Sequence, residues 1–311
     1  MQQGTLKNIF ITGCGGFLGG SLAQYLLKNG FAVTGSSRKN SQQLSKELNI
    51  EVQSCDHLYD VPEMKNIDCL IHCATPNDII SRENDGGYPL AVNAVKRLLE
   101  AVTDQQVGKV ILLSTVQVYG GDLVGNIDEM TDVCCNNHYA LNHFFSEEIA
   151  RLAAKVNNID ITCVRLSNVF GLPVTSSVSR SSLVPFCFID ELLSEGKITL
   201  RSSGLQTRNF VHTEMVASSI EKILGQFPDA FKIFNLGSSW HPSILEVAKL
   251  CVEVAAQDFD LSSHISVNSP LPSKSNDFSL SGNCYSPSLA PQEIKSIMRS
   301  TIKSLIMLGL R

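Results

Sequence analysis

Long apolar runs are missing from this sequence, and long basic runs are missing as well. No stretch approaches the ~18 consecutive apolar residues typical of a transmembrane helix, and the N-terminal residues lead directly into a strand-like run. We therefore expect neither a membrane span nor a signal peptide. The formal net charge is −5 at pH 7, and without a basic cluster this balance argues against a nucleic-acid partner.

The C-x-x-C motif is also absent, although the sequence has ten cysteines. Cys69, Cys73 and Cys163 stand in apolar, strand-like runs, where a buried thiol packs as a small hydrophobic group. Cys134 and Cys135 are adjacent, and we interpret them as loop residues, with a reactive pair of thiols as the alternative. The pattern predicts a reduced, cytoplasmic protein without a zinc site.

Residues 7–30 contain a strand-like run, a glycine-rich turn and a helical pattern, in this order. Residues 8–12 are apolar like a buried parallel strand, and apolar side chains then recur at helical spacing from Leu18 to Leu27. The glycines of the turn and of the start of the helix are Gly13, Gly15, Gly16, Gly19 and Gly20, and Gly30 ends the stretch. Such a turn lets the backbone approach a pyrophosphate closely, and the helix N-terminus offers it free N–H groups. We interpret the stretch as a dinucleotide-binding fingerprint, with an ordinary glycine-rich turn as the alternative.

The end of the second expected strand, at residues 31–37, bears on the choice of cofactor. An NAD-binding unit usually has Asp or Glu there to hold the ribose 2′-hydroxyl. This sequence has Ser37, Arg38 and Lys39 instead, which can bind a 2′-phosphate that an acid would repel. The sequence therefore favours NADP over NAD. The alternative is that Arg38 and Lys39 form a solvated loop.

Strand-like runs alternate with helical patterns through the first half of the chain. Further strands are expected at 50–55, 68–74, 109–115 and 161–166, and further helices at 88–102 and 139–156. This alternation predicts an α/β fold with a Rossmann-type, doubly wound parallel sheet and helices on both faces. With 311 residues and 43% apolar content, the chain is long enough for a large core.

The second half of the sequence is less regular. Residues 173–185 are rich in Ser and Val, and residues 262–291 are rich in Ser, Pro and Asn. We expect residues 1–171 to form a dinucleotide-binding domain, to which 209–239 return. Residues 172–208 and 240–311 are expected to form a smaller, loop-rich C-terminal substrate lobe over the strand ends, where ligands bind in such sheets.

Four segments carry a more specific pattern. They are 12–19 (T-G-C-G-G-F-L-G), 114–120 (S-T-V-Q-V-Y-G), 165–171 (R-L-S-N-V-F-G) and 208–212 (R-N-F-V-H). In order and content these segments resemble the extended short-chain dehydrogenase/reductases, the NAD(P)-dependent epimerase/dehydratase group, whose members modify nucleotide sugars. The resemblance covers about residues 5–250 and is loose beyond them.

The resemblance implies a set of site residues. Those implied to hold the cofactor are Gly13, Gly16, Phe17, Leu18, Gly19, Ser37, Arg38, Asp56, His72, Ala74, Asn93 and Ser114. Asn168 and Arg208 are implied to face the phosphates of the substrate, and Arg208 has the planar fork that suits a diphosphate. Thr115 and Tyr139 take the positions of the catalytic hydroxyl and phenol. The residues alone leave other roles open: Thr115 as a strand cap, Arg208 in a surface ion pair, and His72 as an internal structural residue.

One position departs from the family pattern. The family's Y-x-x-x-K reads here as Tyr139 followed by His143. In the family, that lysine binds the nicotinamide ribose and lowers the pKa of the tyrosine. A unit charge ~5 Å away at an effective dielectric constant of ~20 is worth about 3 kcal/mol, or roughly two pKa units. A neutral histidine can orient the ribose, but it supplies no fixed charge.

The missing charge bears on the direction of the reaction. Oxidation of a sugar hydroxyl needs the tyrosine as a base, whereas reduction of a keto group needs a protonated phenol. Together with the Ser37-Arg38 pair, this favours an NADPH-dependent reductase of a keto group on a nucleotide-activated sugar. Thr115, Tyr139 and His143 are its expected catalytic residues. Two alternatives stay open: a nucleotide-sugar epimerase with bound NAD, and a catalytically impaired dinucleotide-binding protein.

Family members often pair through the helices expected here at 88–102 and 139–156. Both helices carry apolar residues beyond a single stripe, among them Leu98, Leu99, Phe144 and Phe145. We therefore expect a homodimer. Packing of these side chains against the sheet is the alternative.

Overall fold

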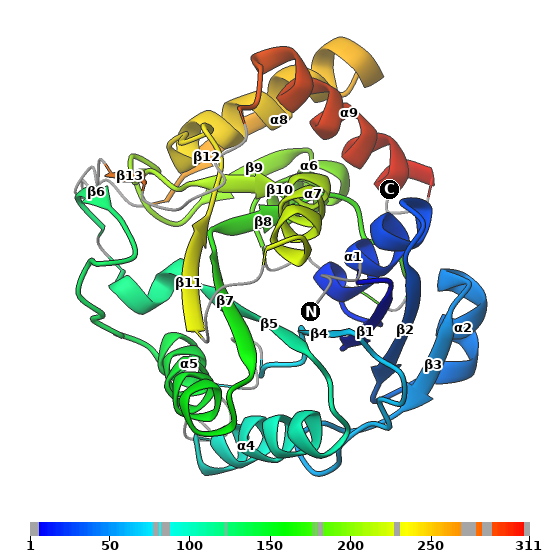
Figure 1. Cartoon of the computed structure of the whole chain (residues 1–311). Coiled ribbons are helices and arrows are strands. Elements are labelled where there is room, and N and C mark those ends of the chain that lie inside the picture. The colour runs from blue at the N-terminus through cyan, green and yellow to red at the C-terminus, as the bar shows by residue number, and fades with distance from the viewer. Residues whose placement is uncertain are drawn as a thin grey trace.

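A seven-stranded parallel sheet forms the centre of this computed structural model (Figure 1). The structure describes residues 6–76, 81, 88–121, 123–176, 178, 183–226, 231–268, 278–281 and 288–307. The strands of the sheet are β1 (Asn8–Thr12), β2 (Ala32–Ser37), β3 (Glu51–Ser54), β4 (Cys69–His72), β5 (Lys109–Thr115), β7 (Asp160–Leu166) and β11 (Phe231–Leu236). Their order is β11-β7-β5-β4-β1-β2-β3, so the expected doubly wound arrangement is confirmed.

The order of the strands determines where a ligand can bind. β1 lies inside the sheet and pairs with β2 on one side and with β4 on the other. The chain therefore builds the sheet outward in one direction up to β3 and in the opposite direction from β4. This reversal leaves a crevice at the carboxyl ends of β1 and β4, which is the usual ligand position in open parallel sheets.

Helices cover both faces of the sheet. α1 (Phe17–Lys28) and α7 (Thr213–Leu224) pack on one face, with α2 (Ser41–Leu48) beside them, and α4 (Tyr88–Asp104) and α5 (His138–Asn157) cover the other (Figure 1). Side chains alternate along β1, because Ile9 and Ile11 join the core under α1 and α7, whereas Phe10 joins the core under α4 and α5. This alternation explains why the central strands are apolar along their whole length.

The remaining described elements lie mainly beyond the carboxyl ends of the strands (Figure 1). They are η1 (Val116–Tyr119), β6 (Gly125–Ile127), β8 (Asn168–Phe170), α6 (Phe186–Glu195), β9 (Lys197–Leu200), β10 (Phe210–His212), α8 (Ile244–Phe259), β12 (His264–Val267), β13 (Phe278–Leu280) and α9 (Pro291–Met307). The short strands form the parallel pairs β10-β8, β12-β9 and β13-β6. α6, α8 and α9 enclose a separate apolar core that includes Phe188, Ile198, Val247 and Met298. A second layer of packed structure therefore faces the strand ends.

Neither a membrane-spanning helix nor a metal-binding cluster is found among the described residues. None of their helices is long and apolar enough to cross a lipid bilayer. Among the same residues, no group of three or more His, Cys, Asp or Glu side chains is arranged to hold a metal ion.

Candidate active site

A cavity of about 1710 Å³ lies at the carboxyl ends of β1, β2, β4 and β5. Its lining runs from the glycine turn after β1, past the ends of β2 and β4, to the start of α5 and the segments around Asn168 and Arg208. Pockets for one drug-sized ligand usually measure ~300–1,000 Å³. This cavity therefore has room for a dinucleotide and a second ligand side by side.

The glycine turn packs tightly against the first turn of α1. Gly13 has φ +68°, which favours glycine, and a Cβ at Gly19 would overlap the backbone oxygen of Gly13. α1 begins directly after Gly16, which provides no side-chain cap to the first N–H groups of the helix. Uncapped N–H groups at a helix N-terminus bind phosphate oxygens. The turn therefore fits the pyrophosphate of a dinucleotide.

The end of β2 presents positive charge to the same cavity. Arg38 is exposed and lines the cavity beside Ser37, whose hydroxyl donates a hydrogen bond to the carbonyl of Lys39 (3.2 Å). Burial lowers the pKa of His57 to about 4; Asp56 opposes this shift and the charge of Arg38 adds to it. Arg38 therefore lies close enough to the Asp56-His57 segment to influence it.

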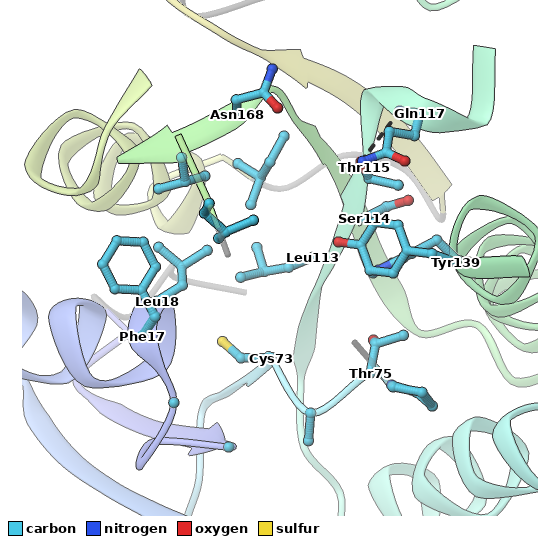
Figure 2. A pocket seen from close by; sticks show the side chains of 18 of the residues that line it. Phe17, Leu18, Cys73, Thr75, Leu113, Ser114, Thr115, Gln117, Tyr139 and Asn168 are labelled. Atoms are coloured by element: carbon cyan, nitrogen blue, oxygen red, sulfur yellow. Dashed lines mark hydrogen bonds between the residues drawn. The ribbon is translucent and has the colours of Figure 1, made fainter. Parts of the chain in front are cut away.

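The side chains of the reacting end lie across the cavity from the glycine turn. Figure 2 shows Phe17 and Leu18 on one side and Ser114, Thr115 and Tyr139 on the other, with the phenol oxygen pointing into the space between them. Thr115 Oγ1 accepts a hydrogen bond from the N–H of Gln117 (3.2 Å) and so caps η1. Its own O–H remains a potential donor, because a hydroxyl accepts and donates at once. Thr115 therefore both caps η1 and forms part of the cavity wall.

His143 lies one helical turn after Tyr139 in α5. The two rings meet edge to face, with centroids 4.6 Å apart. The imidazole is buried, and burial lowers the pKa of His143 to about 4 against an opposing backbone interaction with Leu113. His143 is therefore neutral at pH 7, and the phenol of Tyr139 has no ammonium beside it at the position of the family's lysine.

Most of the site residues expected from the sequence come together around this cavity. Those that line it are Gly13, Gly16, Phe17, Leu18, Gly19, Ser37, Arg38, Asp56, Ala74, Ser114, Thr115, Tyr139, His143, Asn168 and Arg208. The structure does not bring His72 or Asn93 to it. His72 is buried with its Nδ1 2.8 Å from Thr12 Oγ1, and Asn93 is exposed on α4.

Several polar residues of the cavity were missed by sequence reasoning. Gln117, Asn136, Asn137 and His138 line it near the start of α5. Asn137 Nδ2 donates to Gln117 Oε1 (3.2 Å) and to Asn136 Oδ1 (3.1 Å), while Asn137 Oδ1 caps α5 by accepting from the N–H of Ala140 (2.8 Å). Amides both donate and accept, so this cluster suits a hydroxyl-rich ligand. Its position just before Tyr139 was the signal available in the sequence.

Asn168 and Arg208 reach the cavity from the second layer. Asn168 Nδ2 donates to the carbonyl of Asn209 (2.9 Å), and Arg208 Nη1 donates to the carbonyl of Thr207 (2.9 Å). These bonds hold both side chains at the cavity wall. A guanidinium placed there is a suitable partner for a diphosphate.

A short segment from the second layer packs against the glycine turn and the start of α1; we name it the strap (residues 174–176). Thr175 Oγ1 donates to the carbonyl of Gly15 (3.2 Å), and Ser176 Oγ donates to Glu47 Oε1 in α2 (2.7 Å). The hydroxyl of Ser176 is the first cause of the lowered pKa of Glu47, and Gln43 adds to it. The strap therefore links three chain segments around the N-terminus of α1.

The chain is similar to known proteins in sequence and in fold. Its sequence is 24% identical to a dTDP-D-glucose 4,6-dehydratase of Dictyostelium discoideum over 282 residues, a match that covers 80% of this chain and only 62% of that protein. It is 24% identical to a dTDP-4-dehydro-6-deoxy-D-allose reductase of Streptomyces bikiniensis, covering 80% and 81% of the two chains. The fold matches a UDP-glucuronic acid 4-epimerase from Bacillus cereus in complex with UDP-glucuronic acid and NAD, with TM-score 0.77, 21% identity and coverage of 96% and 99%. The family model of the NAD dependent epimerase/dehydratase family matches residues 9–237, and the chain therefore belongs to that family.

Proposed function

We propose that the protein is an NADPH-dependent reductase of a keto group on a nucleotide-activated sugar. The observation that carries the proposal is the neutral, buried His143 against the ring of Tyr139. Without a cation at this position, the phenol keeps its proton at neutral pH, which is the state that a reduction needs. Relatives of the chain include a protein named as a keto-sugar reductase.

The glycine turn and Arg38 support a dinucleotide as the cofactor of this reaction. The glycines of the turn line the cavity beside the uncapped N-terminus of α1, which suits a pyrophosphate, and Arg38 at the end of β2 suits a 2′-phosphate. Two of the solved relatives, MoeE5 and the UDP-glucuronic acid 4-epimerase from Bacillus cereus, are named as complexes with NAD. The choice of NADP for this chain rests on Ser37 and Arg38, which stand where an NAD-binding unit usually has an acid.

The residues of the reacting end have distinct roles in the proposed reaction. When bound, the reduced nicotinamide supplies a hydride to the carbonyl carbon. Thr115 binds the carbonyl oxygen through its O–H, and Tyr139 gives its phenol proton to that oxygen as negative charge develops there. His143 supports the ring of Tyr139 and offers a neutral hydrogen-bonding group to the ribose.

We further propose that the second layer binds the nucleotide sugar, with residues 172–208 and 240–311 as the substrate lobe. Arg208 and Asn168 take the diphosphate, since both line the cavity. The amides of Gln117, Asn136 and Asn137 bind the hydroxyl groups of the sugar. UDP-glucose, UDP-glucuronic acid and UDP-N-acetylmuramic acid are among the ligands named with solved relatives.

A second function, epimerisation with a retained NAD, is favoured by one observation. The strap bonds both to Gly15 and to Glu47 and so ties the glycine turn, which lines the proposed cofactor site, to α2. An epimerase oxidises and re-reduces its substrate with one bound cofactor, so a glycine turn that is held in place by such bonds suits it. A reductase has to exchange its cofactor in every turnover.

We also propose a homodimer formed through α4 and α5. Leu98 and Leu99 of α4 are buried against the sheet, so they do not carry this proposal. Leu152 and Val156 of α5 are 59% and 70% exposed and do support it. Sedimentation at micromolar concentration tests the dimer, and a Leu152→Glu variant should then sediment as a monomer; a monomeric wild type contradicts the proposal.

The reductase is tested with NADPH and a panel of nucleotide keto sugars. Tyr139→Phe should lower turnover by about 100-fold or more, because the proton donor is lost, while NADPH still binds. Tyr25→Phe is the control, since the hydroxyl of Tyr25 donates to Glu221 away from the cavity. Full activity of Tyr139→Phe would show that the assigned acid is wrong. Binding of NADPH by a wild type that turns over no substrate would favour the impaired dinucleotide-binding protein.

A further inference from the structure

A buried ion pair lies beside the reacting end of the cavity and has no part in the reaction proposed above. Glu147 of α5 has no exposed surface, and Arg165 of β7 is 2% exposed. Arg165 Nη2 donates to Glu147 Oε2 (2.6 Å), and Arg165 Nε donates to Glu147 Oε1 (3.0 Å). The pair is thus bidentate, which fixes the orientation of both groups as well as their separation.

The same carboxylate binds the strand that carries Thr115. Ser114 Oγ donates to Glu147 Oε1 at 2.5 Å, and Ser114 directly precedes Thr115 at the end of β5. On the helix, Glu147 lies one turn beyond His143 and two turns beyond Tyr139. One carboxylate therefore connects the strand with the reacting hydroxyl to the helix with the reacting phenol.

The network continues into the segment that follows Thr115. The guanidinium of Arg165 lies over the ring of Tyr119 in η1, 4.7 Å from its centroid. The hydroxyl of Tyr119 donates to Asn235 Oδ1 (2.7 Å), and the N–H of Asn235 donates to Glu129 Oε1 (2.9 Å). A continuous chain of polar contacts therefore runs from Glu147 on α5, through Arg165 and Tyr119, to Asn235 on β11.

Burying two charges is expensive, and well-packed apolar residues would join a helix to a sheet at least as stably. An apolar contact, however, tolerates sliding and rotation, whereas a bidentate pair with a third donor does not. We propose that Glu147 is a positioning residue, which sets the separation of Thr115 Oγ1 and the phenol of Tyr139 through Ser114 and Arg165. The inference rests on the proposed function.

The chain contains a matched control on the same two strands. Lys109 of β5 is buried, and its Nζ lies 3.4 Å from Oδ2 of Asp160 in β7. These residues are at the amino ends of the strands, away from the cavity. Breaking this second pair therefore measures how much stability is lost with a buried ion pair, while the reacting end of the cavity stays unchanged.

The test compares Glu147→Gln with Asp160→Asn in the full chain. Both variants should lower the melting temperature. Only Glu147→Gln should lower kcat, by about 100-fold as expected for a reacting group displaced by ~1 Å, while KM for NADPH changes by less than about twofold. Ser114→Ala, which keeps the ion pair and so the fold, should lower kcat by about tenfold. Equal kcat values for Glu147→Gln and Asp160→Asn would overturn the proposal.

A second readout separates this inference from the proposed function. In crystal structures of the wild type, Glu147→Gln and Ser114→Ala, the distance from Thr115 Oγ1 to the phenol oxygen of Tyr139 should change in both variants. An unchanged distance would overturn the positioning role. If the wild type is inactive on every nucleotide keto sugar, the proposed function fails, and the distance still decides whether Glu147 sets the geometry.

Discussion

The imidazole ring of His143 lies edge-on against the phenol ring of Tyr139, with the centroids 4.6 Å apart. The family pattern has lysine at this position of the helix, so the contact replaces a cation beside the phenol by a neutral aromatic ring. Burial keeps that ring uncharged, because it lowers the pKa of His143 to about 4. A cation restored at this position should therefore change the pKa of the phenol and with it the pH dependence of the reaction.

We expect His143→Lys to move the basic limb of the pH–rate profile down by one unit or more. An ammonium ~5 Å from the phenolate at an effective dielectric constant of ~20 is worth about 3 kcal/mol, which corresponds to roughly two pKa units. The oxidative direction should gain more than the reductive one, because only oxidation needs the phenolate before hydride transfer. The measurement is a pH–rate profile in both directions for the wild type and the variant.

The control for this change is His264→Lys, which adds the same charge at an exposed position of β12. It should leave the profile as it is in the wild type. An unchanged profile for His143→Lys would mean that the residue has no influence on the phenol, and the roles given to Tyr139 and His143 would have to be reassigned.

The buried histidines predict how stability depends on pH. Burial lowers the pKa of His143 and His57 to about 4 and that of His72 to about 3. Below the usual value of ~6.5 the unfolded chain takes up protons that the folded chain does not, so stability falls as the pH drops from ~6.5 toward the folded values. Each such histidine contributes a slope of up to about 1.4 kcal/mol per pH unit.

Urea unfolding at several pH values between 7 and 5 measures this slope. His143→Gln should reduce the slope in this window, because it removes one group that is held neutral, whereas replacement of the exposed His264 by Gln should leave it close to that of the wild type. A wild type whose free energy of unfolding is the same at pH 7 and pH 5 would contradict the prediction.

Much of the fold followed from local patterns in the sequence. The strand at 8–12, the glycine turn and the helix after it were recognisable because apolar period and glycine spacing are properties of adjacent residues. The contact of the strap with Glu47 was not, since it joins residues 129 positions apart. The hydrogen bond from Ser114 to Glu147 could not be predicted for the same reason, since it joins residues that are 33 positions apart.

The two residues that the structure leaves outside the cavity show the limit of motif matching. A motif places a residue in an element but does not give the face on which the residue lies. On the strand before the cavity, successive side chains alternate, so Cys73 lines the cavity while His72 turns inward to Thr12. Asn93 belongs to a helix whose buried side packs on the sheet, and it lies on the exposed side of that helix.

The cofactor preference follows from Arg38. We expect Arg38→Ala to weaken NADPH binding by about 1.5–3 kcal/mol, the usual loss for a hydrogen bond to a charged group. NADH lacks the 2′-phosphate, so its affinity should change little and serves as the internal control. Both dissociation constants are measured by cofactor fluorescence. Equal affinities of the wild type for the two cofactors, or tighter binding of NADH, would refute the NADP assignment.

The strap predicts how fast the cofactor leaves, and this rate distinguishes the two proposed functions. The double change Thr175→Val and Ser176→Ala removes the hydroxyls that bond to Gly15 and Glu47. Release of NADPH should become at least roughly two to ten times faster, because the bond of Thr175 to the neutral carbonyl of Gly15 alone contributes about 0.5–1.5 kcal/mol. Displacement of bound NADPH in a stopped-flow instrument measures the rate. Ser194→Ala is the control, since that hydroxyl bonds within its own helix.

The wild-type release rate then has to be compared with turnover. A reductase cannot turn over faster than it exchanges its cofactor, whereas an epimerase with a retained cofactor can. Release that is at least as fast as turnover, with net consumption of NADPH, agrees with the reductase. Release much slower than turnover would reject it and favour the epimerase, and in that case the strap variants should lose cofactor during prolonged turnover while the Ser194→Ala control keeps it. A release rate that the double change leaves unaltered would show that the strap does not hold the cofactor in either reaction.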